Sequence, residues 1–196
     1  MVCKRGVETL IVCLGNERVC DDGIGARAGR ILESLPLPDG VTVTKVQSLH
    51  IGLLDQLAES ERLLIIDALS TGAEPGMCTV ADVTELPSGT ASADCAHART
   101  VANIMDLVRH VSCDSAAPSI DIAGIQGKQF MMYGAEFSAE VSRALPRLVD
   151  LVLLTVGAQL ASRAMVRDVC RELFGAGSEV LPSWQAHELR TDVTGL

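Results

Sequence analysis

Three polar residues at the ends of hydrophobic segments carry the strongest indication of chemistry in this sequence. Asp22 follows an apolar run and a glycine turn, Asp67 ends a second apolar run, and His97 begins a helical pattern. Two carboxylates and an imidazole suit a divalent first-row metal such as nickel or zinc, whereas an all-oxygen shell would suit magnesium or calcium. Three protein ligands leave coordination positions open for water or for groups of another molecule. We therefore predict that Asp22, Asp67 and His97 form a metal-contacting, catalytic site.

Each of these residues also has an ordinary structural explanation. Asp22 can cap a helix that starts near Gly23, where its charge meets the positive end of the helix dipole. Asp67 can form a turn, and a single histidine is more often structural than a ligand. The argument for a site therefore depends on whether the fold brings the three residues together.

The elements that must position them alternate between strand and helix patterns. We predict strands at Thr9–Leu14, Val41–Val46, Leu63–Ile66, Met77–Val83 and Ser119–Ile125, and helices at Ile24–Leu35, Ile51–Ala58, Ala98–Val111 and Ser138–Phe174, the last with a possible break at Gly157. This alternation predicts an α/β fold, a three-layer αβα sandwich whose mostly parallel sheet has about five strands, one of them antiparallel. The short connection before Met77–Val83 predicts that it forms a hairpin with Leu63–Ile66. Residues 1–174 are predicted to be one domain, with 175–196 a tail of unknown role.

Sites in open α/β sheets form beyond the carboxyl ends of the parallel strands, an edge that we call the carboxyl edge. Asp22 and Asp67 each follow such a strand. His97 begins the helix before the last strand, so it lies at the same edge if that strand is parallel. The adjoining loop, residues 84–96, is long enough to favour a function, and Gly124–Gly127 after the last strand is expected to shape a cleft there.

Composition excludes several classes of partner. The net charge of −9, with 25 acidic and 16 basic residues, argues against nucleic acid, which requires clustered Lys and Arg. The seven cysteines form no C-x-x-C pair and are expected to be reduced, as in a cytoplasmic protein. Polar residues interrupt the most apolar helix, Leu145–Leu160, and no signal-peptide pattern precedes the first strand, so we expect no membrane association.

Other catalytic arrangements are weaker. Cys20 would be a nucleophile with His97 as its base, but Asp21 and Asp22 beside it would raise the thiol pKa. The glycines at 23 and 25 lack the third glycine of a dinucleotide site, and no G-x-S-x-G elbow is present.

Several of these segments, in consistent order, resemble the hydrogenase maturation endopeptidases. Family members open with a strand, G-x-G-N and D-[DE]-x-x-G, to which Cys13–Asn16 and Asp21–Gly25 are similar. An I-x-D-A strand end is similar to Ile65–Ala68, and a histidine before the third helix is similar to His97. A G-I-x-P segment after a late strand is similar to Gly124–Gly127. The resemblance runs from about Thr9 to Leu154.

This resemblance implies an aspartyl-type or nickel-dependent endopeptidase with an αβα fold. Its partner would be the large-subunit precursor of a nickel-iron hydrogenase, whose C-terminal extension it removes after nickel insertion. Residues matching Asp22, Asp67 and His97 would contact the precursor's nickel, so that the substrate supplies the metal. Zinc or cadmium is expected to occupy the same ligands in vitro.

The sequence also departs from the family pattern. Cys13 replaces the first glycine of G-x-G-N, and Asp22 stands where many members carry Glu; both features place the chain near the branch that serves formate-hydrogenlyase-type hydrogenases. Gly127 replaces a usual proline, and residues from about 161 onward have no counterpart.

Asp21 is either a cap or a helper in water activation. Three rival functions stay open: a nickel-dependent recognition module or chaperone without cleavage, a small-molecule metallohydrolase, and a cysteine peptidase using Cys20.

Overall fold

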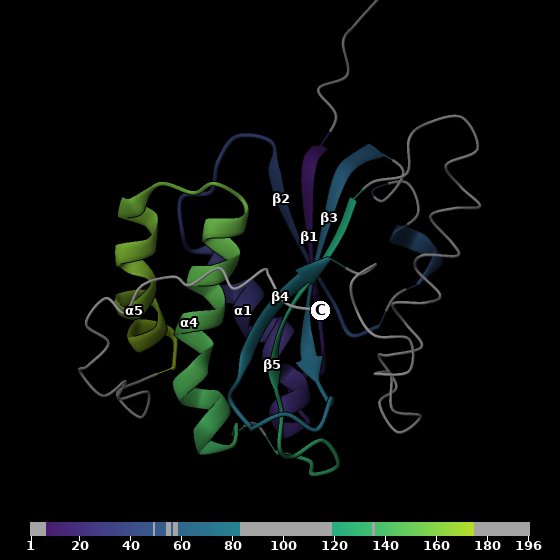
Figure 1. Ribbon diagram of the computed structural model, residues 1–196, viewed down its shortest axis with the longest axis vertical. Coiled ribbons are helices and arrows are strands. Elements are labelled where there is room, and N and C mark those ends of the chain that lie inside the picture. Colours follow the sequence, from purple (N-terminus) through teal and green to yellow (C-terminus); the bar gives the residue numbers. More distant parts are fainter. Residues whose placement is uncertain are drawn as a thin grey trace, which may run out of the picture.

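A five-stranded sheet forms the centre of the computed structural model, and four of its strands run parallel (Figure 1). The structure describes residues 7–48, 50–53, 56, 59–82, 119–134 and 136–174. The strands are β1 (Val7–Leu14), β2 (Val41–Val46), β3 (Ser60–Leu69), β4 (Cys78–Asp82) and β5 (Ser119–Gln126). Their order in the sheet is β2-β1-β3-β5-β4, so β1, β3 and β5 lie inside it. This arrangement confirms the predicted α/β class.

Three long helices lie on one side of this sheet. They are α1 (Ile24–Glu33), α4 (Ala139–Thr155) and α5 (Leu160–Phe174), and Figure 1 shows α4 and α5 side by side. α1 and α4 pack against the strands, and α5 packs on these two helices. Two short 3-10 helices, η1 (Cys20–Gly23) and η2 (Ile51–Leu53), follow β1 and β2. The predicted break of the long helical region is confirmed, since Gly157 adopts a φ of 70° between α4 and α5. A positive φ is accessible to glycine without a steric penalty.

The sheet buries aliphatic side chains on both faces. One core contains Ile11 and Ile66 of the strands together with residues of α1, α4 and α5. The other contains Leu10, Ile65 and their neighbours, with Leu53 of η2 packed on them. Continuous apolar runs in β1 and β3 follow from this two-sided burial, which is typical of central parallel strands.

The predicted hairpin between the third and fourth strands is wrong. β4 pairs antiparallel with β5, from Cys78 opposite Ile125 to Asp82 opposite Asp121, and it lies at the edge of the sheet. β5 is inserted between β3 and β4. Its run from Ile120 to Ile125 is more apolar than β4, so the inner position buries more hydrophobic surface.

Several expectations concern residues outside the described part of the chain. These are His97, the loop 84–96, the helix Ala98–Val111 that would cover the second face of the sheet, and the tail 175–196. The proposed boundary between domain and tail therefore stays a prediction. No helix within the described segments is long and apolar enough to cross a membrane.

Candidate functional site at the carboxyl edge

The register of the parallel strands brings the predicted site segments together. Cys13 of β1 lies opposite Ile66 of β3, so the residues that follow each of them, Leu14 and Asp67, are also neighbours. Asp67 in turn lies opposite Gly124 of β5. The ends of three adjacent strands thus meet at the carboxyl edge, as the sequence predicted for Asp22 and Asp67.

Two glycines allow η1 and α1 to approach these strand ends. Gly15 has a φ of 139°, and a Cβ there would overlap the carbonyl oxygen of Asp22. A Cβ on Gly25 would overlap the carbonyl oxygen of Leu14 and lie 2.6 Å from that of Ile66. The chain therefore needs glycine at both positions because backbone packs directly on backbone. This contact positions η1, which carries the acidic pair, over the ends of β1 and β3.

Asp67 is a buried carboxylate, with only 4% of its surface exposed. Its Oδ1 accepts a hydrogen bond from the backbone N–H of Ala68 at 2.7 Å. Burying a carboxylate at the end of a hydrophobic strand is unfavourable unless it is paired or bound. The fold thus places a buried carboxylate at the carboxyl edge, at the end of β3.

Asp22 lies next to the turn that ends β1 and is half-buried. Its Oδ2 accepts the backbone N–H of Asn16 at 3.0 Å, and the Asn16 side chain accepts the N–H of Arg18 at the same distance. The carboxylate is thus held by the glycine turn, and the N-cap residue of α1 is Gly23.

Asp21 has a different role from its neighbour. It is fully buried, and its two oxygens accept hydrogen bonds from the backbone N–H groups of Lys128, Gln129 and Ser138 and from the Ser138 hydroxyl, at 2.8 to 2.9 Å. Ser138 precedes α4, so the negative charge also lies at the positive end of that helix dipole. Asp21 therefore fixes η1 to the segment after β5.

Gln126 is a structural residue of the edge that the sequence did not single out for its side chain. It is buried, its Oε1 accepts both the N–H and the hydroxyl of Thr71 at 2.8 Å, and its Nε2 donates to the carbonyl of Gly127. The Gly127 N–H donates to the carbonyl of Leu69. These bonds join the ends of β3 and β5. A glutamine at the end of an apolar strand was the signal in the sequence that could have indicated this role.

Cys20 is a poor candidate for a nucleophile. Its side chain is buried, its backbone has a φ of 26°, and its N–H donates to the carbonyl of Gly134. A Cβ on Gly134, in the loop after β5, would lie 3.7 Å from the sulfur. A buried thiol is poorly placed to attack a peptide carbonyl.

The metal-ligand set cannot be completed from the described residues. Within those segments, no group of three or more His, Cys, Asp and Glu side chains is arranged to hold a metal ion. The two predicted carboxylates lie at one edge, while the predicted imidazole ligand, His97, is outside these segments. A three-ligand site therefore stays a prediction.

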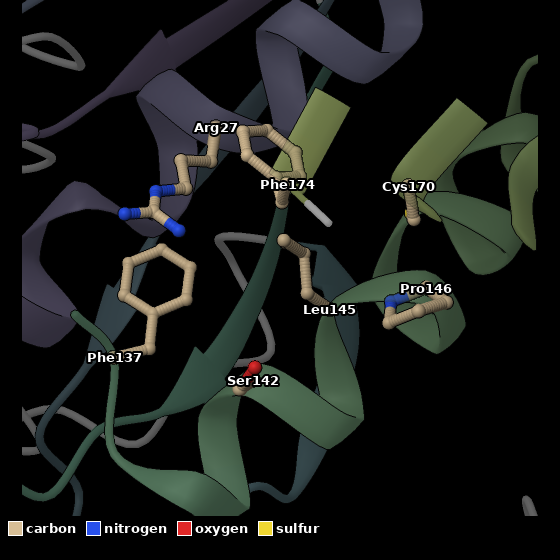
Figure 2. A pocket seen from close by; sticks show the side chains of 7 residues that line it. All are labelled: Arg27, Phe137, Ser142, Leu145, Pro146, Cys170 and Phe174. Atoms are coloured by element: carbon tan, nitrogen blue, oxygen red, sulfur yellow. The ribbon is translucent and has the colours of Figure 1, made fainter. Parts of the chain in front are cut away.

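A small cavity lies between α1, α4 and α5 (Figure 2), and its lining residue Phe137 also lies close to Gly23 of η1. Its volume of about 20 Å³ is enough for about one water. The Arg27 guanidinium lies 4.4 Å from the Phe137 ring centroid and 5.1 Å from that of Phe174, and burial lowers its pKa. Burial also raises the pKa of Cys170, at the other side of the cavity, to about 11. The thiol is neutral and the guanidinium is already engaged, so this cavity offers no catalytic group.

Comparisons with known proteins agree with this architecture. A family model described as hydrogenase maturation protease matches residues 36–155, more than half of the chain. A putative hydrogenase maturation protease from Methanocaldococcus jannaschii is 28% identical over 150 residues, covering 74% of this chain and 94% of that protein. A hydrogenase expression/formation protein from Rhizobium leguminosarum is 25% identical over 146 residues, covering 72% and 70%.

Solved structures give the same result. The [NiFe] hydrogenase maturation protease HybD from Thermococcus kodakarensis is 29% identical with a TM-score of 0.63, covering 76% of this chain and 99% of that one. The hydrogenase maturating endopeptidase HybD from E. coli is 22% identical with a TM-score of 0.66, covering 76% and 92%. The second likeness concerns the fold alone.

Proposed function

The chain belongs to the hydrogenase maturation protease family, and from this premise we propose that it removes the C-terminal extension of a nickel-iron hydrogenase large-subunit precursor after nickel insertion. The family membership expected from the sequence motifs is confirmed. The protein is accordingly a peptide-bond hydrolase of hydrogenase maturation. The nickel dependence, the cleaved segment and the roles of individual residues are the parts that we propose.

One observation carries the proposal: two carboxylates follow the ends of adjacent parallel strands. The pairing of β1 with β3 supports a shared site for Asp22 and Asp67, and Asp67 brings a buried carboxylate to the end of β3. His97 is the proposed third contact. Their oxygen and nitrogen donors suit nickel, and three of them leave positions open for the precursor's own ligands.

In this proposal the nickel arrives as part of the substrate. Asp22, Asp67 and His97 contact the nickel centre and thereby position the scissile peptide at the carboxyl edge. A divalent metal lowers the pKa of a bound water to about 7, which makes such a water a competent nucleophile at neutral pH. Asp21 takes no part in water activation, since four hydrogen bonds already occupy its carboxylate.

The direct experiment compares nickel-loaded and nickel-free forms of the precursor. Each is incubated with the purified protein, and the mass of the precursor is followed over time. We expect a discrete loss of mass from the C-terminus of the nickel-loaded form only. Equal cleavage of both forms would contradict nickel recognition, and tight binding without cleavage would favour a recognition module or chaperone.

A second arm tests the third contact. His97→Ala should leave the protein folded, as judged by circular dichroism, and should lose cleavage of the nickel-loaded precursor. His50→Ala is the matched control, since His50 is exposed and its Nδ1 accepts the N–H of Gly52. Full cleavage by His97→Ala would remove that residue from the site.

A further inference from the structure

The loop after β5 exposes three consecutive large apolar side chains. Met131 is 91% exposed, Met132 59% and Tyr133 89%. Single exposed apolar residues are common on protein surfaces, but a contiguous group of them marks an interaction site more often. We call Met131, Met132 and Tyr133, together with Met77, the apolar rim.

The apolar rim lies at the carboxyl edge rather than elsewhere. Met77 directly precedes β4, which runs antiparallel and so begins at this edge, and its carbonyl accepts the N–H of Gln126 at the end of β5. The described residues contain only two other large exposed apolar side chains, Leu154 and Met165, which lie on α4 and α5. Leu154 is near the end of α4, where the carbonyl of Thr155 accepts a hydrogen bond from Arg62 at the start of β3, the opposite edge.

The loop is held in place on both sides of the exposed residues. Before them, the N–H groups of Lys128 and Gln129 donate to Asp21. After them, the N–H of Gly134 donates to the carbonyl of Arg18, and its carbonyl accepts the N–H of Cys20. Phe130 packs inward against the helix-side core. A surface fixed in this way loses little conformational entropy when it binds.

These bonds also connect the apolar rim to the proposed site. The residues that hold the loop, Arg18, Cys20 and Asp21, lead directly to Asp22. A peptide whose scissile bond lies beside Asp22 and Asp67 would therefore lie close to the loop that carries the exposed side chains. Methionine adapts its shape to an apolar partner, and tyrosine offers a large apolar face with a polar end.

We propose that the apolar rim binds an apolar stretch of the precursor polypeptide that flanks the scissile bond. This inference rests on the proposed function and adds the chemistry of the peptide that the site accepts. The apolar rim supplies affinity and orientation, while the carboxylates engage the nickel centre. Its loss should therefore weaken binding of the precursor without changing the rate of the cleavage step.

The test combines Met131→Ser, Met132→Ser and Tyr133→Ser in one variant, and all three positions are exposed enough for the fold to tolerate the changes. We expect the KM for nickel-loaded precursor to rise at least tenfold, with kcat within twofold of the wild type. Leu154→Ser with Met165→Ser is the matched control and should leave both constants unchanged. Met131→Leu, Met132→Leu and Tyr133→Phe should restore most of the affinity.

The outcomes that contradict the docking surface can be distinguished from those that contradict the proposed function. An unchanged KM in the serine variant removes the docking surface while leaving the proposed function intact. An unchanged KM together with a change in sedimentation of the free protein assigns these side chains to self-association. If the wild type binds the precursor without cleaving it, the same variants are compared by dissociation constant. A wild type that neither binds nor cleaves the precursor overturns the proposed function and the docking surface together.

Discussion

The carboxyl edge of the sheet and the cavity between α1, α4 and α5 differ in what their polar groups do. At the edge, Asp21 and Asp67 are buried carboxylates, and backbone packs on backbone through glycines. In the cavity, the one charged group, Arg27, is stacked between aromatic rings, and the thiol of Cys170 is neutral. This cavity thus presents no reactive group, and the closely packed edge carries the groups suited to a reaction.

The two adjacent aspartates show the same contrast on a smaller scale. Asp21 is enclosed and satisfied by donors from residues more than 100 positions away along the chain. Asp22 is half-buried and held by the turn beside it. One residue therefore stabilises the edge, so that its neighbour can act there.

The largest expected effect is a loss of stability from a substitution that disrupts the close packing of the edge. Gly25→Ala should destabilise the protein by at least about 3 kcal/mol, because a Cβ would meet backbone atoms of both β1 and β3 that cannot move aside. The measurement is the free energy of unfolding from urea titrations. Gly134→Ala is the control, with only the Cys20 sulfur at 3.7 Å, and should change stability by less than about 0.5 kcal/mol. Similar stability of the two variants would contradict the packing described here.

The next effect tests the division of roles between the aspartates. Asp21→Asn should lower the free energy of unfolding by about 2 to 3 kcal/mol. The amide nitrogen of the asparagine would face N–H groups that now donate to a carboxylate. Asp22→Asn should lower the free energy of unfolding clearly less than Asp21→Asn does, since an amide oxygen can still accept the N–H of Asn16. Urea midpoints of the two variants give the comparison directly. A larger loss for Asp22→Asn would reverse the proposed roles.

The smallest effect concerns the cavity and its pH dependence. Folding raises the pKa of Cys170 from 9.0 to about 11, so between these values the folded thiol keeps its proton while the unfolded thiol loses it. Unfolding then releases a proton, and this residue makes stability fall as pH rises above 9, by at most about 1.4 kcal/mol per pH unit. Thermal unfolding from pH 8 to 11 should show a shallower decline for Cys170→Ala than for the wild type. Ser142→Ala, which alters the same cavity without a titrating group, should keep the wild-type slope.

Local sequence patterns predicted much of this molecule for identifiable reasons. The uninterrupted apolar runs before Leu14 and Asp67 could only be satisfied by strands buried on both faces, and this fixed the edge at which Asp22 and Asp67 lie. Gly15 and Gly25 marked the turn, although one of the close contacts that make Gly25 necessary is with Ile66 of β3, a residue about 40 positions away. Periodicity and turn residues are properties of short segments, and the predictions that succeeded depended on such segments.

The features that were missed depend on long-range pairing. Nothing in Met77–Val83 indicates that β5, rather than β3, will be its partner, because strand order is decided by the burial of the whole sheet. The role of Asp21 could not be read from its neighbours, since its donors lie at 128, 129 and 138. The exposure of Met131, Met132 and Tyr133 could not be predicted from the sequence, since it depends on the hydrogen bonds that hold the loop after β5.

The proposed role of Asp22 and Asp67 at the carboxyl edge is to carry the cleavage reaction. Its most direct test is the rate at which nickel-loaded precursor is cleaved by Asp67→Asn and Asp22→Asn, with Asp39→Asn as the control. Asp39 is an exposed carboxylate in the turn before β2, at the opposite edge of the sheet. We predict that both edge variants remain folded and cleave at least about 100-fold more slowly, a loss of about 2.7 kcal/mol in transition-state stabilisation, while Asp39→Asn stays within twofold of the wild type. Wild-type rates from folded Asp67→Asn and Asp22→Asn would contradict the account.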